Sequence, residues 1–144
     1  MPRLLADPPS RAVTIAGHAL SSLAILFLLF DGLIKLPPLD VVTTTLAELG
    51  YPAGIERGLG LMILICTLLY AVPRTAPLGA ILLTALFGGA IATHLRIGSP
   101  VFSHLLFGVY LGLLVWGGLW LRDPRLRALL PFRHATSSPQ GASS

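Results

Sequence analysis

Seven ionisable side chains lie within or beside long apolar stretches of the chain, where such groups are costly unless they are paired or hydrated. They comprise two acids, three bases and two histidines, and we call them the polar cluster: Asp31, Lys35, Glu56, Arg57, His94, Arg96 and His104. A pocket lined by Lys35, Arg96 and His104 would suit a small anion or a polar head group, and Asp31 and Glu56 would serve as internal counter-charges. The chain has no HExxH, CxxC, GxSxG or P-loop motif. The cluster therefore predicts a binding site and leaves open whether the chain is an enzyme.

The two histidines raise the question of a cofactor. His94 and His104 are ten residues apart, with a turn expected between their helices, so their rings can meet in space. Two histidines without supporting ligand spacing are a weak signal for a metal or haem. The single cysteine, Cys66, has no companion for a thiolate site. We expect no metal and no cofactor; the alternative is a quinone site in which His94, His104 and Asp31 lie near the quinone oxygens.

The composition of the 144 residues is that of a membrane protein. Charged residues make up 11% of the chain and hydrophobic residues 54%, whereas soluble domains carry about 25% charged residues. The mean hydropathy is +0.81. These values exclude a disordered protein and an ordinary soluble enzyme, and the net charge of +4 forms no basic face for nucleic acid. We expect a multispan protein whose main partner is the lipid bilayer.

Four apolar runs are separated by breaks rich in proline and charge. We expect them to form helices over about 13–36, 55–72, 76–97 and 101–121. The second run is shorter than the ~20 residues that a bilayer core requires, whereas the other three reach that length. The longest linker, 37–57, carries Val41, Val42, Leu46 and Leu49 at helical spacing among threonines. This pattern predicts a short interfacial helix between spans one and two.

The fold expected from these runs is all-α: a transmembrane four-helix bundle with one interfacial helix. Residues 1–134 form a single four-span domain, and the Ser- and Gly-rich residues 135–144 form a disordered tail. With both termini on one side, seven of the ten basic residues fall on that side, and the polar cluster falls at the opposite end. The positive-inside rule then places both termini in the cytoplasm. These seven residues are Arg3, Arg11, Arg74, Arg122, Arg125, Arg127 and Arg133.

Small residues at steps of four predict where membrane helices approach closely. Four glycines fall on such lines and are expected at helix contacts: Gly60, Gly88, Gly108 and Gly112. The same lines continue to Glu56, Arg96 and His104, which should therefore face neighbouring helices. Asp31 and Lys35 are four residues apart and can pair on one helix face. We also expect Asp31 within ion-pairing distance of Arg96, directly or through Lys35 or a water.

Several short motifs together resemble a known family. They are FDGLIKL at 30–36, ELGYP at 48–52, LGAILLT at 78–84, GGAIATHLR at 88–96 and RDPRLR at 122–127. The combined pattern, over about residues 15–131, resembles the DoxX-like family of small bacterial inner-membrane proteins. The resemblance implies a four-helix protein of the bacterial inner membrane and transfers no catalytic residues. Relatives in the wider superfamily include a subunit of thiosulfate:quinone oxidoreductase.

The expected protein is thus a multi-pass protein of the DoxX-like type in the bacterial inner membrane. Its polar cluster forms a shallow pocket at the periplasmic end of the bundle, for a small anion or a polar head group. One alternative is a membrane subunit of a quinone-linked redox system. Another is a non-catalytic assembly or scaffold partner, in which the small-residue lines contact another membrane protein or a second copy. In that case the polar cluster is interfacial or holds the helices together by ion pairs.

Overall fold

The computed structural model describes residues 10–129, and every regular element among them is helical, as predicted. The expected tail, 135–144, and Arg3 and Arg133 lie outside these residues. The elements in chain order are α1 (Arg11–Ile34), α2 (Asp40–Glu48), α3 (Glu56–Ala71), α4 (Ala76–Arg96), a π-helical turn η1 (Val101–Leu105), α5 (Phe107–Arg122) and α6 (Pro124–Leu129).

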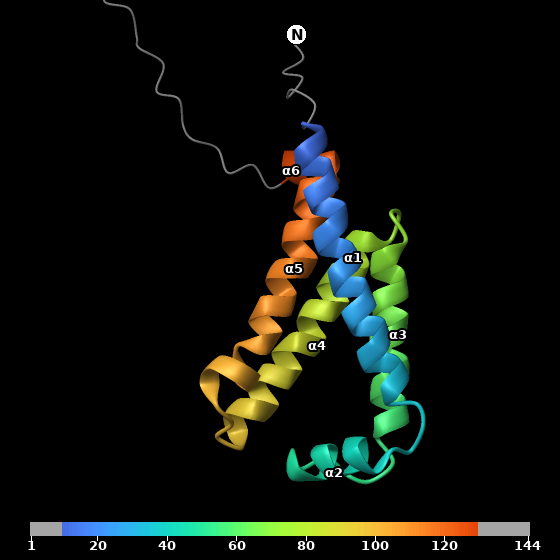
Figure 1. Cartoon of the computed structure of the whole chain (residues 1–144), viewed down its shortest axis with the longest axis vertical. Coiled ribbons are helices and arrows are strands. Elements are labelled where there is room, and N and C mark those ends of the chain that lie inside the picture. The colour runs from blue at the N-terminus through green and yellow to red at the C-terminus, as the bar shows by residue number, and fades with distance from the viewer. Residues whose placement is uncertain (1–9, 130–144) are drawn as a thin grey trace, which may run out of the picture.

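The four longest helices form a ring of neighbours. α1 packs against α3 and α5, and α4 packs against the same two helices from the other side. α1 and α4 run from the end that holds α6 toward the end that holds α2, and α3 and α5 run back (Figure 1). We call these the α6 end and the α2 end. The short α2 lies across its end of the molecule (Figure 1).

Three stretches are long and apolar enough to cross a membrane. They are α1 with 24 residues, α4 with 21, and the continuous stretch of η1 and α5 with 22. α3 has 16 residues, about 24 Å at 1.5 Å per residue, and a bilayer core is ~30 Å thick. The four predicted spans are therefore all helices, and three of them reach the length of a span.

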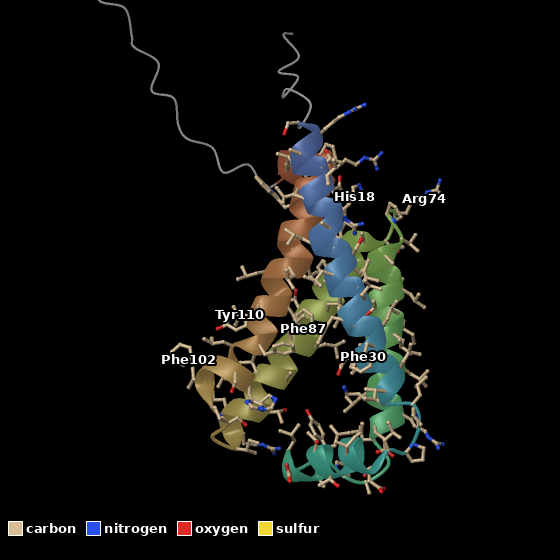
Figure 2. The ribbon with its side chains drawn as sticks, viewed as in Figure 1. His18, Phe30, Arg74, Phe87, Phe102 and Tyr110 are labelled. Atoms are coloured by element: carbon tan, nitrogen blue, oxygen red, sulfur yellow. The ribbon has the colours of Figure 1, made fainter. Side chains whose placement is uncertain are left out.

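Large apolar side chains cover the outside of the ring. Phe102 is 80% exposed and Phe30 is 65% exposed, and Figure 2 shows Phe102 and Tyr110 on the outer side of the helices. The interior contains apolar side chains such as Ala24, Leu83 and Val115, all fully buried. Contiguous exposed apolar surface is typical of a protein that faces lipid.

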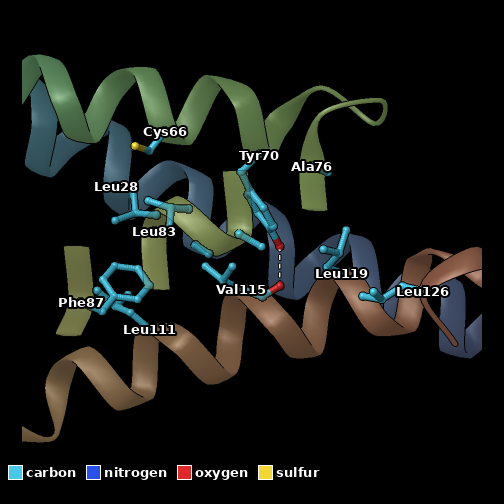
Figure 3. Close-up of a cluster of buried hydrophobic side chains, with 12 residues drawn as sticks. Leu28, Cys66, Tyr70, Ala76, Leu83, Phe87, Leu111, Val115, Leu119 and Leu126 are labelled. Atoms are coloured by element: carbon cyan, nitrogen blue, oxygen red, sulfur yellow. Dashed lines mark hydrogen bonds between the residues drawn. The ribbon is translucent and has the colours of Figure 1, made fainter. Parts of the chain in front are cut away.

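A buried tyrosine joins three of the helices. Tyr70 on α3 is fully buried, and its hydroxyl donates to the Val115 carbonyl on α5 at 2.7 Å (Figure 3). The same hydroxyl lies 2.9 Å from Ser21 Oγ on α1, which therefore donates to it. The Arg122 guanidinium donates to the Tyr70 carbonyl at 3.1 Å and lies 5.0 Å above the ring. These contacts satisfy polar groups that apolar surroundings would otherwise leave costly.

Two of the glycines expected at helix contacts lie at close approaches. A Cβ placed on Gly60 would lie 2.7 Å from the carbonyl oxygen of Gly32, between α3 and α1. A Cβ on Gly108 would lie 2.9 Å from Ile91 Cγ1 on α4. A larger side chain at Gly60 would force α1 and α3 apart, whereas one at Gly108 would first displace the Ile91 side chain.

The other two predicted glycines require correction. A Cβ on Gly88 would meet no atom within 4 Å, and one on Gly112 would meet only Phe87 Cδ2, at 4.0 Å. Tighter contacts occur at two glycines that are not among the four expected, Gly79 and Gly118. A Cβ on Gly79 would collide with the backbone of Tyr70, and one on Gly118 would lie 2.5 Å from Ser21 Oγ.

Candidate functional site

A cavity of about 630 Å³ lies between the helices toward the α2 end. Its walls come from α1, α3, α4 and α5, and Leu46 and Leu49 contribute from α2 and the residue after it. Most lining side chains are apolar, among them Phe27, Ile63 and Leu86. Its volume falls within the ~300–1,000 Å³ of small-molecule sites.

Polar side chains line part of this otherwise apolar cavity: Asp31, Lys35, Tyr51, Thr93, His94 and His104. The Lys35 ammonium forms an ion pair with the Asp31 carboxylate, as predicted from their spacing. Lys35 Nζ also donates to the Asp31 carbonyl at 3.3 Å. Pairing offsets the cost of holding both charges in partly buried, apolar surroundings.

The two histidines of the cluster lie side by side. The ring centroids of His94 and His104 are 5.5 Å apart, with 56° between the ring planes. His94 Nδ1 lies 3.0 Å from Ser99 Oγ, and His104 Nδ1 lies 2.7 Å from Ser103 Oγ. The serines occupy one nitrogen of each ring, so each Nε2 is the nitrogen left for a ligand. Within residues 10–129, no three His, Cys, Asp or Glu side chains are grouped closely enough to hold a metal ion.

The π-helical turn η1 carries one of the two histidines. The Leu105 and Leu106 amides donate to carbonyls five residues earlier, at 3.3 and 2.9 Å. This turn joins the loop after α4 to α5 and places His104 beside His94. Single π-helical turns occur frequently at functional sites.

A tyrosine that the cluster did not include also lines the cavity. The Tyr51 hydroxyl lies 2.9 Å from Thr93 Oγ1, and Thr93 Oγ1 donates to the Gly89 carbonyl at 2.9 Å. Thr93 therefore accepts from Tyr51. In the sequence Tyr51 stands out only within the ELGYP motif, and its distance of 42 residues from Thr93 gives no spacing signal.

Arg96 has a different partner from the one expected. Its side chain is exposed, and Nη2 donates to the Leu49 carbonyl at 3.0 Å, just after α2. In the described part of the chain the ion pair of the cluster is Lys35–Asp31, so the direct Asp31–Arg96 pair is not formed. The Asp31 carboxylate already has a cation, whereas the carbonyls at a helix C-terminus lack intrahelical donors.

The remaining two members of the cluster lie away from the cavity lining. Glu56 is the first residue of α3 and is 8% exposed, a position where a carboxylate is stabilised by the helix dipole. Arg57 follows it and is exposed. The structure thus brings four of the seven cluster residues to the cavity, while Arg96 contacts the segment that covers it.

The fold and the apolar exterior define the chain as a helical membrane protein. The model of the DoxX-like family matches residues 19–118, which include α2, α3, α4, η1 and most of α1 and α5. The chain belongs to the DoxX-like family, and the resemblance found in the sequence is confirmed. No curated protein and no solved structure matches the chain.

Proposed function

We propose that this protein binds a small amphiphilic molecule in the bacterial inner membrane. The cavity is the main support for this proposal. Its walls are largely apolar but include the Asp31–Lys35 pair and the His94–His104 pair. A free anion would leave the apolar walls in contact with water. An amphiphile would bury them, at about 25 cal/mol per Å² of apolar surface, and would present its head group to the polar residues.

The polar residues have distinct tasks in this proposal. The Lys35 ammonium gives two of its three donors to Asp31, one to the carboxylate and one to the carbonyl, and the third donor suits a head-group oxygen. The Nε2 atoms of His94 and His104 add two further polar contacts. Because serine hydroxyls bond to both Nδ1 atoms, the rings are oriented before a ligand binds.

A four-span topology also belongs to this proposal, and the chain direction supports it. α1 and α4 run the same way, so the chain must return between them, and α3 is the helix that does so (Figure 1). Its 16 residues are short for a span. Local thinning of the bilayer accommodates a short helix at modest cost.

A quinone is the second candidate ligand. It is an amphiphile whose carbonyl oxygens accept hydrogen bonds, and the Nε2 atoms of the paired His94 and His104 rings at the cavity are suitable donors when protonated. This candidate would make the protein part of a quinone-linked redox system. Identification of the bound molecule separates it from a lipid.

Two adjacent glycines of α4 allow a sharp test. A Cβ on Gly88 or Gly89 meets no atom within 4 Å, but only Gly89 lines the cavity. We expect Gly89→Phe to fill the cavity and lower ligand occupancy about tenfold, equivalent to ~1.4 kcal/mol. Gly88→Phe should bind as the wild type does.

Native mass spectrometry from nanodiscs reports occupancy, and chromatography of an organic extract identifies the molecule as lipid or quinone. A bound amphiphile that is lost only from Gly89→Phe supports the proposal. Equal occupancy in both variants, or none in the wild type, overturns it and favours an assembly role.

A further inference from the structure

We infer that α2 is a lid over the cavity, and that Arg96 and Tyr51 form the latch that holds it to α4. This inference rests on the proposed function, because it assigns the route by which the ligand reaches the same site. Opening the lid would admit a molecule from the aqueous side of the α2 end rather than sideways from the lipid.

The position of α2 supports a covering role. α2 crosses the α2 end, where the long helices are spread apart (Figure 1). Leu46 on α2 is 7% exposed, and both Leu46 and Leu49 line the cavity. The inner face of this segment is therefore part of the cavity wall, and the cavity becomes wider at the α2 end if the segment moves away.

The attachments of α2 are few. Among the described elements, α2 packs mainly against α3. Two side-chain hydrogen bonds tie the segment after α2 to the last two turns of α4. Arg96 Nη2 donates to the Leu49 carbonyl at 3.0 Å, and the Tyr51 hydroxyl lies 2.9 Å from Thr93 Oγ1. The cluster of buried apolar side chains at the core has members on α1, α3, α4, α5 and α6 but none on α2, so α2 can move without disrupting that cluster.

The backbone beside the latch contains two glycines in the left-handed region. Gly50 has φ +81° and Gly54 has φ +89°, and they flank Tyr51. A Cβ on Gly50 would lie 3.1 Å from Arg96 Nη2. Glycine at this position thus leaves room for the guanidinium to reach the Leu49 carbonyl, and the two glycines allow the segment to change conformation around Tyr51.

The rate at which the single cysteine of the chain, Cys66, reacts with a thiol reagent measures opening of the lid. Cys66 is 6% exposed and lines the cavity, so a permanently charged methanethiosulfonate reagent reaches it only through an aqueous opening. The latch variant Arg96→Gln with Tyr51→Phe should react with this reagent about tenfold faster, which corresponds to ~1.4 kcal/mol of opening free energy. The control is Arg74→Gln with Tyr110→Phe, which makes the same chemical changes away from the cavity.

Unfolding is separated from opening by circular dichroism and by melting in the same nanodiscs. If the latch variant does not fold, the milder Tyr51→Phe alone is used, and a smaller acceleration is expected. Equal reaction rates in the latch variant, the control and the wild type overturn the lid. This readout needs no ligand, so a faster reaction without any bound amphiphile would retain the lid and reject the proposed function.

Discussion

Ionisable residues that line the cavity already have partners within the protein. Lys35 pairs with Asp31, and each histidine has a serine hydroxyl on its Nδ1 atom. Such pairing explains how these groups are held beside apolar walls without a bound molecule. It also means that a ligand finds them oriented, so binding loses less side-chain freedom than at an unformed site.

Tyr70 makes buried polar contacts toward the α6 end, with Ser21 on α1 and Val115 on α5. The Tyr70→Phe substitution removes its hydroxyl without changing the ring. We expect Tyr70→Phe to lower the free energy of unfolding by about 1–3 kcal/mol, because the Ser21 hydroxyl and the Val115 carbonyl lose a partner in buried surroundings. Tyr110→Phe is the matched control, since Tyr110 is 46% exposed. Unfolding in mixed micelles measures both, and equal stabilities would mean that the Tyr70 hydroxyl contributes nothing net.

At the residue scale, the sequence predicted contacts that follow helix spacing. The Asp31–Lys35 pair is four residues apart on one helix, so its geometry is local. The Arg96–Leu49 bond spans 47 residues and ends on a backbone carbonyl. Every residue has a carbonyl, so residue types alone do not identify such an acceptor, and the acid Asp31 was the more obvious partner.

The individual helices were easier to predict than the faces they bury. The four longer runs match the structure closely at both ends, and α2 lies within the linker where a short helix was expected. The inward face of α4 does not follow the predicted line through Gly88. Four residues turn an α-helix by about 400°, so two steps of four from Ala80 reach Gly88 about 80° away from it. The buried face instead follows steps of four, three and four through Ala76, Ala80, Leu83 and Phe87, with Gly79 beside Ala80.

This corrected face of α4 gives a prediction about packing. Gly79→Ala should lower the free energy of unfolding by about 1–3 kcal/mol, because the new Cβ would lie 2.5 Å from Tyr70 Cα and force α3 and α4 apart. Gly88→Ala, on the same helix, should be neutral or stabilising by about 0.5–1 kcal/mol. Thermal unfolding in detergent compares the two. Similar losses in both variants would place Gly88 at a contact after all.

At the scale of the whole molecule, charge and architecture agree. Arg11 begins α1, Arg122 ends α5, and Arg125 and Arg127 lie on α6, all at the α6 end. Arg74 lies in the turn between α3 and α4, toward the same end (Figure 2). The sequence could predict this asymmetry because it depends only on the order of helices and charges. The cavity could not be predicted in the same way, because it arises from how far the helices spread.

This distribution predicts which side of the membrane each end faces. Basic residues flanking spans are retained in the cytoplasm, so the α6 end and both termini should be cytoplasmic and the lid and cavity should face the periplasm. A fluorescent protein fused after Ser144 should be bright, and alkaline phosphatase fused there should be inactive. Fusions truncated after Gly54, beyond α2, should give a dark fluorescent protein and an active phosphatase. Fusions truncated after Arg74 should return to the cytoplasmic pattern only if α3 crosses the membrane. A periplasmic signal after both Gly54 and Arg74 would reduce α3 to a non-spanning helix, and an active phosphatase at Ser144 would turn the cavity toward the cytoplasm.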